Sequence, residues 1–270
     1  MRMPKVSVLM PVFNHGQYVD NAVRSILEQT FQDFEFIIIN DGSTDQTSEI
    51  LLKMTDPRIS VIKIEHNSGM ARALNRGIHE SRGEYIARMD ADDVSHPKRL
   101  ERQVTFLDQH PEVAVVGTMC WMIDAEGKKK KLGNAYAQDR EIKWLLSQNS
   151  GRTPLWHPSV MMRRAHLFEV GLYREDLDYA IDKELWLRMA RKGYRFANIQ
   201  EPLLDKREPV YRHDYQAHIK RHRESRDKVY KCHAETVLFL KCQYHFSWWK
   251  SRFLAFFCFF FHPRIFSGKE

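Results

Sequence analysis

The stretch "YIARMDADD" (residues 85–93) ends an apolar run with three carboxylates, Asp90, Asp92 and Asp93, in four positions. These carboxylates repel one another unless a positive charge lies among them. Aspartates one residue apart at a strand end suit a hard divalent cation, which completes its shell with water and phosphate oxygens. Such an ion neutralises charge that develops on a phosphate leaving group. A purely structural alternative is an Asp-rich turn that caps a helix beginning near Pro97.

The strands and helices that must position this cluster recur at regular intervals along the sequence. Four short apolar runs of strand type span residues 6–12, 34–40, 59–64 and 84–89, and their starts lie roughly 25 to 28 residues apart. Helical patterns separate these runs, as in β-α-β units. The sequence therefore predicts an α/β fold with a mostly parallel sheet flanked by helices.

Polar turn residues follow three of these runs, at residues 11–14, 40–45 and 89–93. Ligands of parallel sheets bind beyond the carboxyl ends of the strands, so we expect the three turns to border one crevice. In the second turn, Ser43 and Gln46 fit a capping box that opens the next helix.

The middle of the chain is less regular. Its pattern predicts a helix over residues 97–109, a strand over 113–118 and a helix over 183–193. Several familiar motifs are missing. The first turn, "PVFNHG", has a single glycine, which disfavours a dinucleotide site, and the sequence contains no GxxxxGK[ST] or GxSxG motif.

Taken together, four segments resemble family 2 glycosyltransferases: "VSVLMPVFN", "AVRSILEQTFQDFEFIIINDGSTDQT", "NSGMARALNRGIHESRGEYIARMDADD" and "GLYREDLDYAIDKELWLRMARKGY". They occur in the family's order and cover roughly residues 5–213. The resemblance implies a GT-A fold and an inverting glycosyltransferase of the bacterial cell-surface polysaccharide type. It further implies transfer of one hexosyl or N-acetylhexosaminyl unit from a nucleoside-diphosphate sugar, expected to be a UDP-sugar, with Mn²⁺ or Mg²⁺.

The resemblance also implies a role for each residue of the nucleotide site. Pro11 would begin the loop beside the base, and Asp41 would pair with the base. Arg72 would approach the base or the diphosphate, because arginine matches phosphate geometry. Asp90 would hold the ribose.

By the same resemblance, Asp92 would bind the metal that bridges the two phosphates, and Asp93 would lie near the donor sugar. His213, in "PVYRHD", would be a further metal ligand. The catalytic base of the family is the aspartate of a Glu-Asp pair. Here that pair reads Ile181-Asp182, so Asp182 is the expected base, and Ile181 puts the acceptor contact or the pKa of the base in question. The chemistry parallels an inverting glycosidase, in which a carboxylate activates the nucleophile opposite the leaving group.

The expected division is a GT-A domain over residues 1–213, with a nucleotide-binding half (1–95) and an acceptor half (96–213), and a basic, aromatic helical tail over 214–270. Within "FSWWKSRFLAFFCFFFHPRIF" (246–266), aromatic rings beside basic residues favour the headgroup boundary of a membrane. The alternative is a helix packed on the domain or on a partner.

No uninterrupted apolar stretch is long enough to predict a transmembrane helix. The four cysteines form no CxxC pair and indicate reduced thiols. We therefore expect a cytoplasmic protein, peripheral on the inner face of the cell membrane through anionic lipid, that acts on a lipid-linked or surface-glycan acceptor.

Two other functions fit an α/β sheet of this kind: a sugar-nucleotide nucleotidyltransferase and a catalytically inactive GT-A-like binding protein. The first needs a glycine-rich basic loop after the first strand, which "PVFNHG" does not supply; the second is suggested only by Ile181. The net charge of +7 would suit nucleic acid, but no nucleic-acid motif accompanies it, so no nucleic-acid partner is expected.

Overall fold

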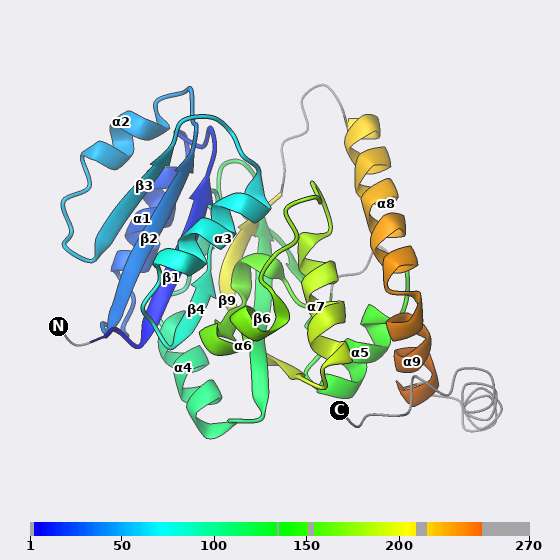
Figure 1. Cartoon of the computed structure of the whole chain (residues 1–270). Coiled ribbons are helices and arrows are strands. Elements are labelled where there is room, and N and C mark those ends of the chain that lie inside the picture. The colour runs from blue at the N-terminus through cyan, green and yellow to red at the C-terminus, as the bar shows by residue number, and fades with distance from the viewer. Residues whose placement is uncertain (1–2, 134, 151–153, 209–214, 245–270) are drawn as a thin grey trace.

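The computed structural model in Figure 1 describes residues 3–133, 135–150, 154–208 and 215–244. Within them, nine strands form one sheet in the order β3-β2-β1-β4-β8-β6-β9-β5, and β7 pairs with β6 off this path. The strands are β1 (Val6–Val12), β2 (Phe34–Asp41), β3 (Ile59–Ile64), β4 (Tyr85–Arg88), β5 (Val94–Ser95), β6 (Val113–Ile123), β7 (Lys129–Gly133), β8 (Met161–Arg163) and β9 (Arg195–Arg207).

Helices surround the sheet on both faces. They are α1 (Val19–Leu27), α2 (Thr47–Leu52), α3 (Met70–Glu80), α4 (Arg99–Gln109), α5 (Asp139–Leu146), α6 (Arg164–Val170), α7 (Ile181–Arg191), α8 (Tyr215–Cys232) and α9 (Ala234–Tyr244), with a short 3₁₀ turn at His157–Ser159. Figure 1 shows α8 and α9 beside α7, on the side away from β1–β3.

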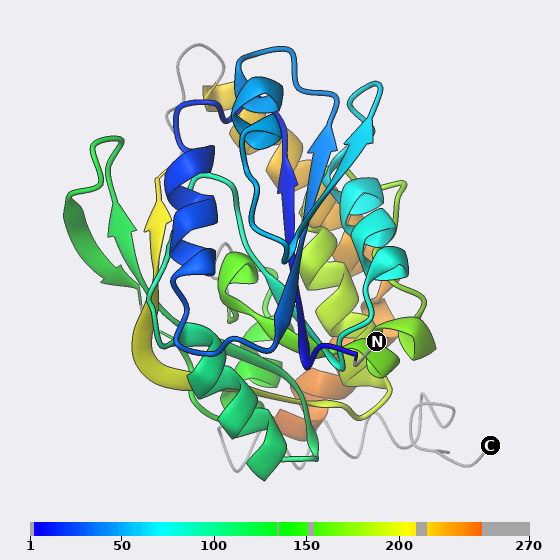
Figure 2. The ribbon, with the colours of Figure 1, turned by 90° about the vertical axis from the view of Figure 1, so that its left-hand side faces the viewer.

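The first four strands of the chain are parallel, as the predicted α/β fold requires. β1 lies between β2 and β4, and β3 pairs with β2, all in parallel register; Figure 2 shows β1, β2 and β3 running in one direction. β8 is antiparallel to both β4 and β6, so β6 and its parallel partner β9 run with β1 again. The carboxyl ends of β1, β2, β4, β6 and β9 therefore meet at one edge of the sheet.

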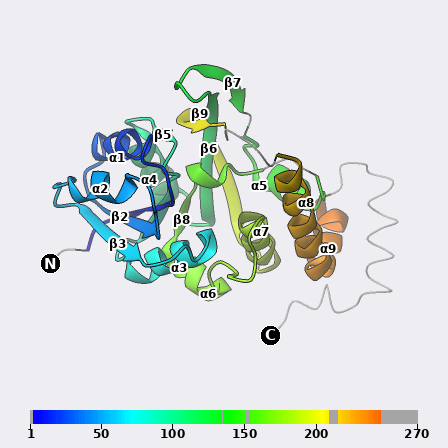
Figure 3. The ribbon, with the colours of Figure 1, turned by 90° about the horizontal axis from the view of Figure 1, so that it is seen from above.

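Alternation along β1 divides the core between the two faces of the sheet. Val6, Val8 and Met10 are buried with α1, α2 and α4, whereas Leu9 is buried with α3, α6 and α7. This is the period of two that a strand covered on both faces requires. Seen from above in Figure 3, α1 and α4 lie on one side of the sheet and α3 and α6 on the other.

Most predicted elements of the first half are confirmed, but the capping box is wrong. α2 begins at Thr47, after an N-cap at Gln46 without a side-chain cap. The Ser43 hydroxyl instead accepts a hydrogen bond from the backbone N–H of Asn14, at 3.0 Å. A contact between two turns at the sheet edge has replaced the local cap that the sequence pattern indicates.

The second half departs further from the predicted pattern. The strand predicted over residues 113–118 continues to Ile123, and the helix predicted to start at residue 183 starts at Ile181. The long strand β9 was not predicted. It pairs with β6 through several register shifts, one of them next to Thr118, and it also pairs with β5.

None of the helices within the described ranges combines the length and hydrophobicity that a membrane-spanning segment requires. Cys120 and Cys232 are free thiols, as expected, whereas Cys242 is disulfide-bonded, so the expectation of reduced thiols is wrong for that residue. His213 and the aromatic segment 246–266 lie outside the described residues. The division at residues 95 and 213 stays a prediction.

Gly42 holds the turn after β2 against the loop that enters α3. Its φ of +73° is a left-handed conformation, and a Cβ there would lie 2.6 Å from the backbone nitrogen of Asn67. Gly127 shares the positive φ (+85°) but has nothing within 4 Å of such a Cβ. At Gly42, therefore, both backbone strain and a close approach oppose a side chain.

We expect Gly42→Ala to lower the free energy of unfolding by at least about 1 kcal/mol more than Gly127→Ala, because only Gly42 adds a backbone clash to the strain of positive φ. Urea denaturation of the two variants measures the difference. Equal losses in the two variants would show that the close approach of Gly42 to the backbone of Asn67 does not affect stability.

Candidate functional site

The three carboxylates of the cluster lie together beyond the end of β4. One oxygen from each of Asp90, Asp92 and Asp93 can be chosen so that all lie within 4.8 Å of one another. Asp90 and Asp92 are half-buried, whereas Asp93 is only 1% exposed. Its Oδ1 accepts a hydrogen bond from the backbone N–H of Arg207, at 2.8 Å, and its Oδ2 is buried without a partner among the described residues.

Arg88 supplies a positive charge that the sequence reasoning missed. Its Nη2 lies 2.6 Å from Asp90 Oδ1, and its side chain is 2% exposed. Nη2 also donates to the sulfur of Met70 at 3.3 Å, while Nε and Nη1 are buried without a hydrogen-bond partner in the described part of the chain. Residues two apart in an extended chain share a face, so the spacing of Arg88 and Asp90 could have indicated this pair.

Strand β9 brings two further basic residues to the cluster. Arg207 Nε donates to the carbonyl oxygen of Asp92 at 2.9 Å, in addition to the bond from its backbone N–H to Asp93. The neighbouring Lys206 acts electrostatically on all three carboxylates. The local sequence around Asp90 does not predict that Lys206 lies nearby, because the pairing of β9 with β5 and β6 brings Lys206 to the cluster.

Burial and neighbouring charges shift the pKa values of the three carboxylates in different directions. Burial opposes ionisation of Asp90, but Arg88 outweighs it and lowers the pKa of Asp90 to about 2. Burial and then the charge of Asp90 raise the pKa of Asp92, and the same two causes raise that of Asp93 well above its usual value. The raised pKa values of Asp92 and Asp93 show that the neighbouring cations do not fully offset the repulsion among the three carboxylates.

A cavity of about 390 Å³ joins Asp90 of this cluster to the start of α7. Its polar lining includes Arg88, Asp90, His157, Asp182, Lys206 and His222. Asp182 lies in the first turn of α7, after Ala180 in a left-handed conformation (φ +57°). The structure therefore brings the predicted base, Asp182, and Asp90 of the predicted Asp-rich site to one cavity, although they are far apart in the sequence; Asp92 and Asp93 lie beside Asp90 but do not line the cavity.

His157 and Tyr173 form one wall of this region. His157 Nε2 lies 2.9 Å from the hydroxyl oxygen of Tyr173. Burial, and then the charge of Arg88, lowers the pKa of His157 to about 3, so the imidazole is neutral at physiological pH. It can exchange hydrogen bonds with a bound group without adding charge.

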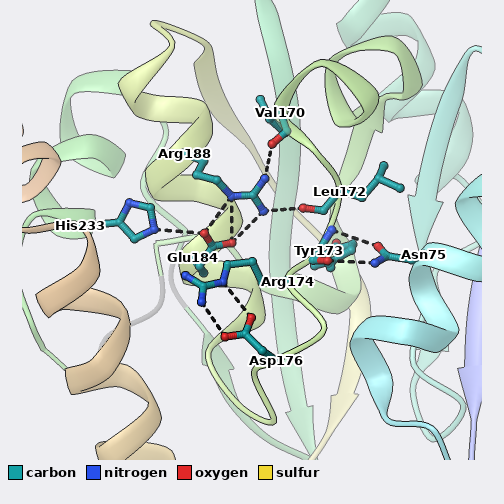
Figure 4. Close-up of polar contacts among 9 residues, drawn as sticks. All are labelled: Asn75, Val170, Leu172, Tyr173, Arg174, Asp176, Glu184, Arg188 and His233. Atoms are coloured by element: carbon teal, nitrogen blue, oxygen red, sulfur yellow. Dashed lines mark hydrogen bonds and ion pairs between the residues drawn. The ribbon is translucent and has the colours of Figure 1, made fainter.

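The segment that carries Tyr173 is clamped from both sides, as Figure 4 shows. From α7, Arg188 donates hydrogen bonds to the backbone carbonyls of Val170 and Leu172. From α3, Asn75 exchanges two hydrogen bonds with the backbone of Tyr173, at 2.9 and 3.0 Å. These contacts connect the segment before Asp182 to helices on either side.

Glu184 anchors this clamp. It is fully buried, pairs with Arg188 through both oxygens at 2.7–3.0 Å, and lies 3.0 Å from His233 Nε2 (Figure 4). Burial opposes ionisation of Glu184, but hydrogen bonds from His233 and Arg188 hold the pKa of its carboxyl below the usual value. The residue thereby ties α7 to the turn between α8 and α9.

The other predicted nucleotide-site residues lie as follows. Asp41 is 3% exposed, and its oxygens accept hydrogen bonds from Ser68 N, Ser68 Oγ and Gly69 N at 2.7–3.0 Å, so it fixes the loop into α3. A carboxylate has about four acceptor positions, so these contacts among the described residues use three of them. Arg72 has a side chain 59% exposed and pairs with Glu175 at 3.4 Å.

Pro11 is placed differently from the expectation. It is a buried residue inside β1, paired with Ile39, and the strand continues to Val12. The loop therefore begins after Val12 and not at Pro11. Contact of Pro11, Asp41 or Arg72 with a nucleotide stays a prediction, as does the role of Asp93 toward the sugar.

A divalent cation fits the acid cluster. Carboxylate oxygens are the ligands that Mg²⁺ and Mn²⁺ prefer, and trans oxygens on one Mg²⁺ lie about 4 Å apart. The spacing of 4.8 Å or less needs only small side-chain adjustments. The buried Asp93 Oδ2 without a partner among the described residues adds an acceptor that such an ion, or its bound water, would satisfy.

Comparison with known proteins defines the class. The profile of the family described as "Glycosyl transferase family 2" matches residues 7–169, more than half of the chain. The "Putative glycosyltransferase EpsE" of Bacillus subtilis is 34% identical over 216 residues, which cover 76% of this chain and 73% of that protein. The chain therefore belongs to glycosyl transferase family 2 and is a glycosyltransferase, as its motifs predict.

Two solved structures share the fold. TarS 1-349 of S. aureus in complex with UDP-GlcNAc has a TM-score of 0.66 at 19% identity, covering 98% of this chain and 73% of that one. The mannosyltransferase PcManGT of Pyrobaculum calidifontis, in complex with GDP-Man and Mn²⁺, has a TM-score of 0.64 at 19% identity, covering 100% of this chain and 77% of that one. The predicted GT-A fold is confirmed.

Removing the anchor of the clamp should destabilise the protein. We expect Glu184→Ala to lower the free energy of unfolding by about 3 kcal/mol, because it leaves Arg188 largely buried without its carboxylate. Asp176→Ala is the matched control. It removes the exposed pair with Arg174 in the same segment, whose side chains are 53% and 36% exposed, and should cost less than about 1 kcal/mol.

Chemical denaturation of both variants measures the two losses. A loss in Glu184→Ala no larger than that in Asp176→Ala would mean that the clamp does not hold this part of the fold.

Proposed function

We propose that this protein is an inverting, metal-dependent glycosyltransferase that moves one hexosyl or N-acetylhexosaminyl unit from a UDP-sugar to a hydroxyl acceptor. The observation that carries the proposal is the shared cavity. It is lined by Asp90, which belongs to an Asp-rich cluster suited to a divalent cation, and by the acidic residue Asp182. This is the arrangement that separates a leaving diphosphate from an activated nucleophile.

Asp92 and its neighbours Asp90 and Asp93 would hold Mn²⁺ or Mg²⁺. When bound, that ion supplies Lewis-acid stabilisation of the departing diphosphate. His213 is proposed as a further ligand, from the sequence motif alone. The bound complexes named for the two solved structures, with UDP-GlcNAc and with GDP-Man and Mn²⁺, support a nucleotide-sugar donor and a metal; the choice of UDP rests on the family resemblance.

Asp182 would act as the general base. Its position in the first turn of α7, on the cavity wall, allows its carboxylate to accept the proton of an acceptor hydroxyl. A base opposite the leaving group gives inversion at the sugar carbon. Ile181, where the family has glutamate, is 5% exposed and packs in the core, so Asp182 would act without an acidic neighbour at that position.

The acceptor is proposed to be lipid-linked or a surface-glycan precursor, reached from the cytoplasmic face of the membrane. Support comes from the charge of α8, whose residues 219–232 carry six cations against two acids: Lys220, Arg221, Arg223, Arg226, Lys228 and Lys231 against Glu224 and Asp227. Such a helix attracts anionic lipid. The aromatic segment 246–266 that follows it in the sequence would add interfacial anchoring.

Asp92→Asn tests the metal site. Wild-type protein should gain thermal stability from UDP with Mn²⁺, because a ligand that binds only the folded state stabilises it. Asp92→Asn should lose most of that gain. Differential scanning fluorimetry measures it, with the exposed Asp176→Asn as control, and a full shift in Asp92→Asn would remove Asp92 as a ligand.

Asp182→Asn tests the base. It should retain the thermal shift with UDP and Mn²⁺ but lower the turnover rate by about 10²–10⁴-fold, because only proton transfer is lost. Release of UDP from a panel of UDP-sugars, with and without candidate acceptors, measures the rate. Undiminished transfer in Asp182→Asn would exclude this residue as the base.

A further inference from the structure

Lys206 is placed beside the acid cluster by the pairing of two strands. Val94 of β5 is in register with Asp205 of β9, in antiparallel pairing. Around that pair, the backbone N–H of Arg207 donates to Asp93 at 2.8 Å. Residues 205–207 therefore run alongside residues 92–94, and Lys206 shares a cavity with Asp90 and Asp182.

The ammonium of Lys206 is charged but not tied to a single carboxylate. In the described part of the chain its hydrogen bond is to the carbonyl oxygen of Arg207, at 3.4 Å, and it makes no direct ion pair there. Burial opposes its charge, but Asp93, Asp90 and Asp92 outweigh burial and raise the pKa of Lys206. A flexible, half-buried ammonium in this position can move toward a bound anion.

Arg88 is not equivalent to Lys206, although both lie near Asp90. The side chain of Arg88 is 2% exposed, and its guanidinium forms an ion pair with Asp90 at 2.6 Å, so a ligand would have to break this pair to bind it. Lys206 is half-buried and lines the cavity. Of these two cations, Lys206 is the one that a ligand in the cavity can reach without breaking an ion pair.

The charges of the cluster then favour joint binding of metal and nucleotide. The guanidinium of Arg207 donates to the backbone carbonyl oxygens of Asp92, Asp124 and Ala125, so it is not counted against the carboxylates. Arg88 and Lys206 then leave the three carboxylates at most one net negative charge to attract a divalent cation. A free cation is repelled by Lys206 at close range, whereas a diphosphate is attracted. When both arrive together, the diphosphate offsets the charge of the metal.

We propose that Lys206 supplies the donor site with a cation that binds the diphosphate of the donor and weakens binding of the metal alone. The inference rests on the proposed function of this cavity. It predicts that removing the charge of Lys206 raises the affinity for the metal and lowers the affinity for the nucleotide. A merely structural role of Lys206 would not change the two affinities in opposite directions.

The test is calorimetric titration of full-length wild type and Lys206→Met with Mn²⁺ alone and with UDP alone. Methionine removes the charge and keeps an unbranched apolar stem. We expect Lys206→Met to bind Mn²⁺ at least about fivefold more tightly and UDP at least about fivefold more weakly than wild type. Lys206→Arg, which keeps the charge, should leave both affinities within about twofold of wild type.

Lys192→Met is the matched control. It removes the same charge at the C-terminal end of α7, where Lys192 Nζ donates to the carbonyl oxygen of Glu169, and it should change neither affinity. Thermal melts verify that each variant is folded.

The outcomes separate this inference from the proposed function. If wild type binds neither UDP nor Mn²⁺, singly or together, the proposed function fails and the role of Lys206 fails with it. If wild type binds both, but Lys206→Met shifts the two affinities in the same direction or not at all, the inference alone is overturned.

Discussion

Mutual repulsion of three carboxylates at the end of one buried strand is the constraint on which the site depends. Asp90, Asp92 and Asp93 lie close together, and two cations lie beside them and offset part of this repulsion. Arg88 lies at the end of β4 and pairs with Asp90, whereas β9 places Lys206 near all three carboxylates and donates the backbone N–H of Arg207 to Asp93. The cations of the protein therefore balance most of the negative charge of the three carboxylates, and the remaining negative charge can attract a divalent ion.

The mixed order of the sheet brings these groups together. A short antiparallel strand, β8, lies between β4 and β6, so that β6 and β9 again run parallel to β1. Only with that direction do the ends of β4 and β9 meet at one edge, where α7 also begins. The clamp of Glu184, Arg188 and Asn75 then holds the segment that leads to Asp182.

Local sequence patterns predicted the parts of the molecule that local forces determine. The four strands of the first half and the Asp cluster follow from apolar periodicity and from family motifs, whereas Asp182, expected just before a helix, lies in the first turn of α7. The capping box at Ser43 failed because its hydroxyl bonds Asn14, a residue distant in the sequence. β9 and the placement of Lys206 were unpredictable for a related reason: register shifts against β6 and the pairing with β5 are decided by tertiary packing.

The central claim is that the cavity lined by Asp90 and Asp182 is the donor site, with the metal held by the Asp cluster beside it. Anomalous diffraction from crystals soaked with UDP and Mn²⁺ tests it most directly. The account predicts an anomalous peak within bonding distance of an Asp92 carboxylate oxygen, with the phosphates of UDP between that peak and the cavity wall that carries Asp182. A Mn²⁺ peak away from the three aspartates, or UDP bound outside this cavity, would contradict it.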